Sequence, residues 1–152
     1  MNFIRRLVFR SATAVHSRLY RATGGRLGGS VAGGSVLLLT TTGRRSGKRR
    51  MVPLGYFVEG DDLVVVGSMG GAPVHPSWYH NLRAQPDVEV QVGKAARRMR
   101  ARTATPEERA RLWPGIIETA PAYGRYQERT AREIPLVILS DRRAGGEPPA
   151  DP

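Results

Sequence analysis

Apolar residues gather in short runs along this chain, and the runs predict a protein built mainly of β-strands. Val36 to Thr41 and Leu63 to Gly67 are apolar stretches of strand length. Met51 to Val58 is a third, and Pro53 within it indicates a sheet edge or a bulge. Alternation of valine with polar residues over 88–92 is typical of a half-buried strand.

The second half of the chain adds two strands, Ala95 to Ala104 and Pro135 to Ser140, and several helices. Pro76 to Ala84 is expected to form a short helix. A capped helix begins at Thr105 and is expected to end near Pro114. A further helical piece is expected from about residue 121 to 132. Strands joined by tight turns, with helices beside them, predict an antiparallel, barrel-like α+β domain rather than a doubly wound sheet.

The ends of the chain differ from this central domain, which we place at residues 36–141. Residues 1–23 have the pattern of a basic amphipathic helix, residues 24–35 a glycine-rich connection, and residues 142–152 a disordered tail. Arg10 interrupts the apolar run of the first segment, so neither a signal peptide nor a membrane span is predicted. That helix either lies on an anionic membrane surface or covers the domain's own core.

Charge and cysteine content narrow the possible functions. The 152 residues carry 24 basic and 13 acidic side chains, a formal charge of +11, which favours anionic partners. The absence of cysteine excludes disulfides, thiolate metal sites and cysteine nucleophiles, and is consistent with a cytoplasmic protein. Three scattered histidines give no metal-binding pattern, so no metal is predicted.

The most distinctive segment is the glycine-bracketed turn between the first two predicted strands, LLLTTTGRRSGKRRMVPL. Gly43 and Gly47 allow the backbone to approach a ligand, and the turn carries five cations and no acid: Arg44, Arg45, Lys48, Arg49 and Arg50. It is not a P-loop, because only three residues separate its glycines and an arginine stands where the Mg²⁺-binding hydroxyl belongs. The segment therefore predicts a site for a phosphate or carboxylate group.

Other readings of the glycines and charges are less favoured. The sequence GSMGG at 67–71 lacks the spacing of a dinucleotide-binding loop, and there is no G-x-S-x-G motif. Arg98, Arg100 and Arg102 share one face of a predicted strand, but a solvated outer face explains them. No nucleic-acid partner is expected.

Four segments occur in a recognisable order: the cationic turn, VVVGSMGGAPVHPSWYHNLRAQPDVEVQV, ATPEERARLWP, and PAYGRYQERTAREIPLVIL. Together they resemble the deazaflavin-dependent nitroreductase family, over about residues 36–139. Members use coenzyme F420, an 8-hydroxy-5-deazaflavin with a phosphate and an oligoglutamate tail. The resemblance implies a split β-barrel of the flavin-reductase kind, mostly antiparallel, with flanking helices.

The resemblance also implies the positions of the cofactor site and the catalytic groups. The implied cofactor-binding residues are Arg44, Arg45, Ser46, Arg50, Met51, Val52, Pro53, Leu54, Gly67, Ser68, Met69, Ser77, Trp78, Tyr79, His80 and Asn81. The implied catalytic residues, whose hydroxyls would hydrogen-bond the electron-accepting oxygen, are Ser68, Tyr123 and Tyr126. From the residues alone, the favoured interpretation of Ser68 is a turn cap, and that of the tyrosine pair is one side of a core helix.

The implied reaction is hydride transfer from the reduced deazaflavin to a quinone, enone or nitro acceptor. Met69, Ala120 and Gly55 depart from the family pattern and open the substrate pocket, which makes a quinone or enone a better expectation than a nitroimidazole. Two alternatives remain: a non-catalytic carrier of the same cofactor, and an FMN-dependent oxidoreductase on the same barrel.

Overall fold

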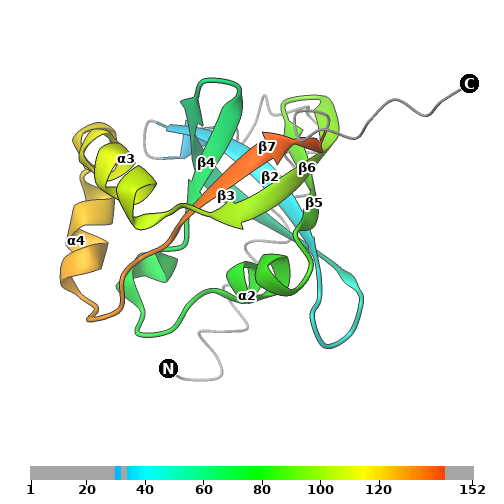
Figure 1. Ribbon diagram of the computed structural model, residues 1–152, viewed down its shortest axis with the longest axis horizontal. Coiled ribbons are helices and arrows are strands. Elements are labelled where there is room, and N and C mark those ends of the chain that lie inside the picture. Colours follow the sequence, from blue (N-terminus) through cyan, green and yellow to red (C-terminus); the bar gives the residue numbers. More distant parts are fainter. Residues whose placement is uncertain (1–29, 32–33, 143–152) are drawn as a thin grey trace, which may run out of the picture.

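Six antiparallel strands close into a barrel in the computed structural model, which describes residues 30–31 and 34–142 (Figure 1). Neighbouring strands pair in the order β2-β3-β4-β7-β6-β5, and β5 returns to pair with β2. The strands are β2 (Gly34–Thr42), β3 (Arg49–Glu59), β4 (Asp62–Val66), β5 (Asp87–Val92), β6 (Ala95–Thr103) and β7 (Leu136–Asp141). The antiparallel barrel predicted from the hairpins is confirmed.

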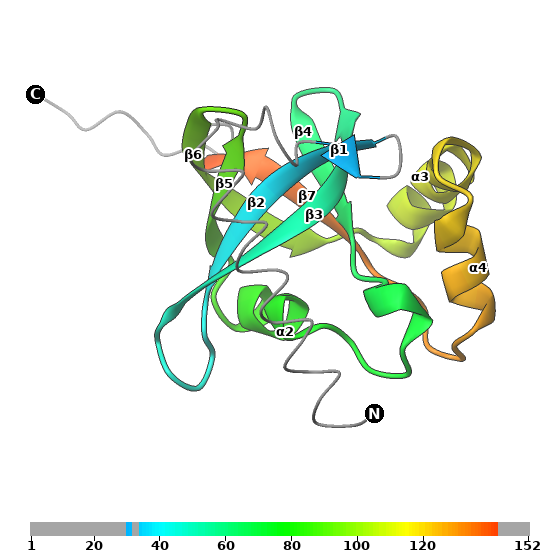
Figure 2. The same cartoon turned by 180° about the vertical axis from the view of Figure 1, so that it is seen from behind.

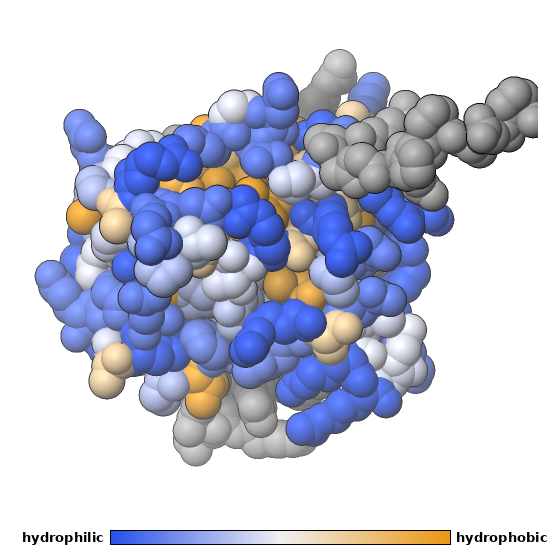
Figure 3. Space-filling view, viewed as in Figure 1, coloured by the Kyte–Doolittle hydropathy of each residue, from blue (hydrophilic) through white to orange (hydrophobic). Residues whose placement is uncertain are grey.

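Two apolar clusters stabilise this arrangement. One fills the barrel interior and includes Leu37, Leu39, Val90 and Met99, all of which are fully buried. The second lies between the barrel and two helices and includes Val64 and Ile138 of the strands. On the face shown in Figure 3, hydrophilic residues cover most of the surface and apolar ones show in smaller patches between them. Burial of these side chains is the main driving force for folding, at about 1.5–3 kcal/mol for each large aliphatic group removed from water.

Helices cover the barrel at one end and along one side (Figures 1 and 2). Helix α2 (Ser77–Ala84) lies across one end, and helices α3 (Pro106–Thr119) and α4 (Ala122–Glu128) lie together beside the barrel. A 3₁₀ turn, η1 (Met69–Gly71), follows β4 and contacts α4. None of the helices in the described part of the chain is long and apolar enough to cross a membrane.

Helix α3 begins as the sequence predicts but ends later. The Thr105 side chain accepts a hydrogen bond from the Glu108 N–H, and the Glu108 carboxylate accepts one from the Thr105 N–H. The prediction that the helix ends near Pro114 is wrong, because helical structure continues to Thr119. Pro114 costs one backbone hydrogen bond, but buried Ile116 in the next turn packs against the barrel and compensates for that loss.

Pro53 lies at a local edge, as expected. It pairs with Leu38 of β2 on one side, whereas β3 begins to pair with β4 only at Tyr56. A two-residue strand, β1 (Ser30–Val31), pairs with the start of β2 inside the segment expected to be a connection. The predicted amphipathic helix at 1–23 and the tail from 143 onward lie outside the described residues.

Candidate active site

The cationic segment forms the hairpin tip between β2 and β3, which we call the cationic tip (residues 43–50). Residues 44–50 are all exposed. Gly47 has a φ of 69°, and a Cβ on Gly43 would lie only 2.6 Å from the Ser46 Oγ. That oxygen accepts a hydrogen bond from the Lys48 N–H at 3.2 Å. The two glycines and the serine therefore shape a tight tip.

Asn81 of α2 ties the cationic tip to the body of the protein. Its buried Oδ1 accepts hydrogen bonds from the Arg44 N–H at 3.1 Å and from Arg44 Nη1 at 3.4 Å. Its Nδ2 donates to Thr41 Oγ1 at 3.2 Å. Asn81 therefore fixes the base of the tip through its side-chain amide.

Most of the positive charge on the cationic tip is uncompensated. Arg49 forms an ion pair with Glu89 at 3.0 Å. Within the described residues, Arg45, Lys48 and Arg50 have no acidic partner and donate no side-chain hydrogen bond. Exposed, unpaired cations of this kind fit an acidic ligand such as a phosphate with a carboxylate-rich tail.

Strand β3 runs from the cationic tip toward α4 and presents two different faces. Val52 and Leu54 pack against the cluster inside the barrel. Because successive side chains of a strand point to opposite sides, Met51, Pro53 and Gly55 share the outer face. Of the β3 residues predicted to line the cofactor, Met51 and Pro53 are thus placed for contact, whereas Val52 and Leu54 support the strand from within.

Tyr123 of α4 lies over the outer face of β3 at Gly55. A Cβ added to Gly55 would lie 3.2 Å from the Tyr123 hydroxyl oxygen. From Arg50 to Gly55 the strand spans roughly 17 Å, at about 3.4 Å per residue. The cationic tip and α4 accordingly lie on opposite sides of the barrel end covered by α2 (Figure 2). A ligand that contacts both must be elongated, with its charged part at the tip.

A strained turn follows β4, and we call residues 67–71 the Ser68 turn. Met69, Gly70 and Gly71 have φ values of 47°, 64° and 80°. A Cβ on Gly71 would lie 2.6 Å from the Tyr126 carbonyl oxygen, so this turn is packed directly on α4. The Ser68 side chain is buried but does not cap the turn, and it makes no hydrogen bond within the described chain.

Tyr123 and Tyr126 project from α4 with their rings 6.1 Å apart in an edge-to-face arrangement. Tyr123 also contacts Phe57 of β3 edge-on, at 6.0 Å. Burial is the main cause that raises the pKa of the Tyr123 phenol, so it remains protonated at neutral pH. Neither hydroxyl has a hydrogen-bond partner within the described residues. Both are available to donate to a ligand.

The predicted residues of α2 divide into buried and accessible ones. Trp78 is part of the barrel core, and the buried Tyr79 forms a hydrogen bond with Thr103 Oγ1 at 2.9 Å. Ser77 is exposed and His80 is half-buried. Ser77 and His80 are therefore the more accessible of the four, whereas Trp78 and Tyr79 seat α2 on the barrel.

Sequence patterns did not identify Arg132 as a site residue. Its side chain nevertheless makes more hydrogen bonds to the Ser68 turn and to the residues that follow it, 72–75, than any predicted residue does. Its Nε donates to the Ala72 carbonyl at 2.8 Å and its Nη2 to the Ser68 carbonyl at 2.8 Å. Its Nη1 donates to the Gly67 carbonyl at 3.2 Å and to His75 Nδ1 at 3.0 Å. Burial, followed by the nearby charge of Arg132, lowers the pKa of His75, and burial lowers the pKa of Arg132. No local motif marks this arginine.

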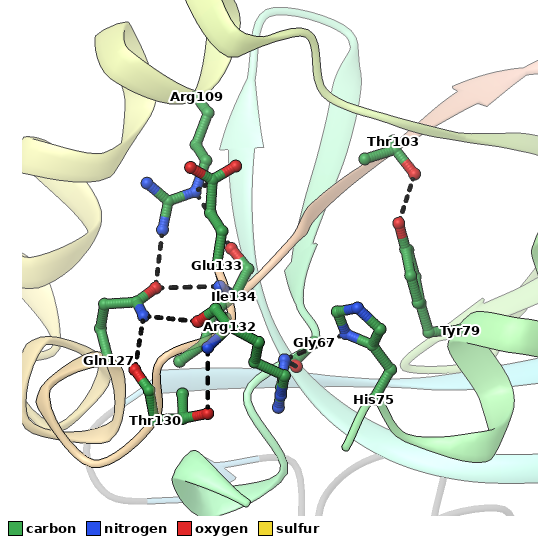
Figure 4. Close-up of polar contacts among 10 residues, drawn as sticks. All are labelled: Gly67, His75, Tyr79, Thr103, Arg109, Gln127, Thr130, Arg132, Glu133 and Ile134. Atoms are coloured by element: carbon green, nitrogen blue, oxygen red, sulfur yellow. Dashed lines mark hydrogen bonds and ion pairs between the residues drawn. The ribbon is translucent and has the colours of Figure 1, made fainter. Parts of the chain in front are cut away.

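The backbone around Arg132 is itself held by α4, as Figure 4 shows. Gln127 Nε2 donates to the Arg132 carbonyl at 2.8 Å, and Gln127 Oε1 accepts from the Ile134 N–H at 2.9 Å. Arg109 of α3 donates to the same Oε1 at 3.0 Å. The segment that carries Arg132 is therefore fixed relative to the helix that carries the two tyrosines.

No group of three or more His, Asp or Glu side chains in the described chain is arranged to hold a metal ion. The closest histidine pair is His75 and His80, with ring centroids 5.8 Å apart. Arg132 already donates to one of these rings. The arrangement suits the binding of an organic anion better than that of a cation.

Comparison with known proteins gives a consistent match. Residues 12–141 match the family model described as F420H(2)-dependent quinone reductase. An F420H(2)-dependent quinone reductase of Mycobacterium tuberculosis is 42% identical over 132 residues, which cover 84% of this chain and 89% of that protein. The resemblance identified from the four segments is confirmed.

Two solved structures extend the comparison to the fold. An F420-H2 dependent reductase superposes with a TM-score of 0.63 at 43% identity, covering 69% of this chain and 93% of that one. A structure described as a domain-swapped dimer has a TM-score of 0.64 at 35% identity, covering 90% and 98% of the two chains. These likenesses confirm the split-barrel fold class.

Proposed function

This chain belongs to the F420H(2)-dependent quinone reductase family of oxidoreductases, whose cofactor is coenzyme F420, and from that premise we propose that it passes hydride from the reduced coenzyme to a quinone. When bound, the reduced deazaflavin supplies the hydride. Hydride and one proton convert the quinone to its hydroquinone, and the coenzyme is oxidised. The protein supplies binding, orientation and the proton.

The cationic tip would hold the phosphate and the acidic tail. Arg45, Lys48 and Arg50 support this role, because they are exposed and unpaired within the described chain. Asn81 keeps the base of the tip in place before any ligand arrives. The outer face of β3, with Pro53 and the side-chain-free Gly55, would lie along the ring system.

The observation that carries the proposal is a set of three hydroxyls on and beside α4 that have no hydrogen-bond partner in the part of the chain that the structure describes. Ser68, Tyr123 and Tyr126 come from segments that contact one another, and none of the three hydroxyls forms a hydrogen bond within the described residues. Tyr79 differs from these three residues, because its hydroxyl forms a hydrogen bond with Thr103. The three free hydroxyls are suited to bind the acceptor oxygen and deliver its proton.

Quinones are the acceptors we place first, and enones and nitro compounds second. A Cβ atom added to Gly55 would lie 3.2 Å from the Tyr123 hydroxyl oxygen, so a larger side chain at this position would crowd that hydroxyl. Gly55 therefore keeps space open beside that hydroxyl, which suits a planar ring with an oxygen at its edge. A nitro group would use the same hydroxyls but requires more than one hydride to complete its reduction.

Fluorescence titration with coenzyme F420, followed by a stopped-flow assay of the reduced coenzyme with quinones, enones and nitro compounds, tests the proposal. We expect binding at micromolar concentrations and oxidation of the reduced coenzyme that depends on a quinone. Binding without oxidation by any acceptor would instead identify a carrier. Preferential binding of FMN over coenzyme F420 would contradict the cofactor assignment.

Peripheral contact of residues 1–23 with anionic membranes is a further proposal, and it rests on the arginine-rich amphipathic pattern of that segment. Cosedimentation with anionic vesicles should fall when residues 1–23 are removed. Unchanged cosedimentation would refute it.

A further inference from the structure

Arg132 joins the segments that carry the candidate catalytic hydroxyls, because its guanidinium binds the Ser68 carbonyl and its own carbonyl is bound by Gln127 of α4. It lies on the connection between α4 and β7, half-buried, and reaches across to the loop that follows β4 (Figure 4). All three of its side-chain nitrogens donate hydrogen bonds there, to three carbonyl oxygens and one ring nitrogen.

These contacts form a closed ring through the structure. Gly71 packs against the backbone of Tyr126, Gln127 in the same helix binds the Arg132 carbonyl, and Arg132 binds the Ser68 carbonyl. The ring closes within the turn, where the Gly71 N–H donates a hydrogen bond to the Ser68 carbonyl at 2.9 Å. The Ser68 carbonyl thus accepts from both the turn and the arginine, so the turn cannot shift relative to α4 without breaking the guanidinium contacts.

The turn needs such support. It contains a non-glycine residue, Met69, at φ 47°, and two glycines at positive φ, and a conformation of this kind persists only where its surroundings fix it. The Ser68 side chain gives no help, because it does not cap the turn. Within the described residues, the guanidinium of Arg132 is the charged group that binds the carbonyls of Gly67 and Ser68.

We infer that Arg132 is a positioning residue that holds the Ser68 hydroxyl at a fixed place relative to Tyr126 and thereby sets the rate of hydride transfer, while the cationic tip sets most of the cofactor affinity. This inference rests on the proposed function. The planar guanidinium is required, because a lysine ammonium offers one charged atom and cannot reach acceptors spread from Gly67 to Ala72. The cationic tip, which would determine affinity, lies on the far side of α2 (Figure 2).

The test compares Arg132→Lys with Arg102→Lys. Arg102 of β6 is a matched control: both of its Nη atoms donate to the Glu108 carboxylate at 2.7 Å, and within the described residues no contact joins it to the Ser68 turn or to Gln127. Arg132→Lys should lower kcat for quinone reduction by between about 10- and 100-fold, the effect expected of a displaced reacting group, with the Kd for coenzyme F420 unchanged within about threefold. Arg102→Lys should lower the melting temperature, because it weakens the contact with Glu108, but leave kcat within about twofold.

Two further readouts separate positioning from a general loss of structure. Amide hydrogen exchange at Gly71 and Ala72, whose N–H groups bond within the turn, should accelerate in Arg132→Lys while the amides of β2 stay protected. In Arg132→Ala, added methylguanidine should restore part of kcat, as it replaces the lost group.

Each outcome has a defined meaning. An unchanged kcat in Arg132→Lys overturns the inference, and so does a loss of kcat that Arg102→Lys reproduces. If the wild-type protein binds no coenzyme F420 or oxidises none with any acceptor, the proposed function fails instead. In that case the exchange measurement still decides whether Arg132 holds the turn, and normal protection in Arg132→Lys overturns that part.

Discussion

The cationic tip and the Ser68 turn are both short glycine-containing loops at the candidate site, but they are built in opposite ways. In the cationic tip the side chains are exposed and Gly47 has no heavy atom within 4 Å of an added Cβ. In the Ser68 turn the backbone carbonyls are bound by Arg132, and Gly71 is in contact with α4. The tip is therefore suited to ligand capture by charge, and the turn to fixed geometry.

This difference predicts unequal sensitivity to the same substitution. Gly71→Ala should lower the free energy of unfolding by about 3 kcal/mol, because a Cβ would lie 2.6 Å from the Tyr126 carbonyl in addition to the strain of φ 80°. Gly47→Ala, at φ 69° in open space, should cost only about 1 kcal/mol. Urea denaturation of both variants checks this. Equal losses would mean that the turn is no more rigidly packed than the tip.

The second prediction concerns chemistry at the rigid region. Tyr126→Phe should reduce kcat for quinone reduction by about 100-fold, because loss of a proton donor usually costs 10²–10⁴ in rate. Coenzyme F420 should bind with unchanged Kd. Tyr79→Phe is the matched control: it removes a hydroxyl that is already paired with Thr103, so it should reduce stability and not kcat. Stopped-flow oxidation of the reduced coenzyme measures both, and equal kcat values for the two variants would remove Tyr126 from the mechanism.

The third prediction concerns affinity at the exposed region. Arg45→Ala should raise the Kd for coenzyme F420 by about three- to tenfold and leave kcat unchanged, because it removes one exposed cation that has no acidic partner in the described chain. The effect should shrink as salt is added. Lys94→Ala, an exposed cation in the turn between β5 and β6, should leave Kd unchanged. If Lys94→Ala weakens binding equally, net charge rather than the cationic tip attracts the coenzyme.

The two regions also show which features can be predicted from a sequence. The cationic tip, the strand order of the hairpins and the cap at Thr105 depend on residues that are close together in the chain, so local patterns indicate them. Arg132 is 64 residues from Ser68, and nothing local distinguishes it from other surface arginines. The true end of α3, at Thr119, is also not visible in the local sequence. Burial of Ile116 against a distant strand outweighs the local effect of Pro114.

The smallest expected effect is a dependence of the Ser68 turn on pH, acting through His75. Because Arg132 can only donate, His75 Nδ1 must accept, which requires a neutral imidazole. The pKa of His75 is lowered from 6.5 in the folded protein by burial and then by the nearby groups Arg132, His80 and Arg83. The unfolded state therefore binds more protons, and the contribution of this contact to stability is fully present above pH 6.5 and is lost as pH falls through the lowered value.

His75→Gln tests this dependence, because it keeps an acceptor oxygen but does not titrate. Its urea midpoint should fall less than that of the wild type between about pH 7.5 and about pH 5. The tip carries no histidine, so Gly47→Ala should follow the wild-type profile; parallel profiles for wild type and His75→Gln would show that protonation of His75 leaves the turn intact.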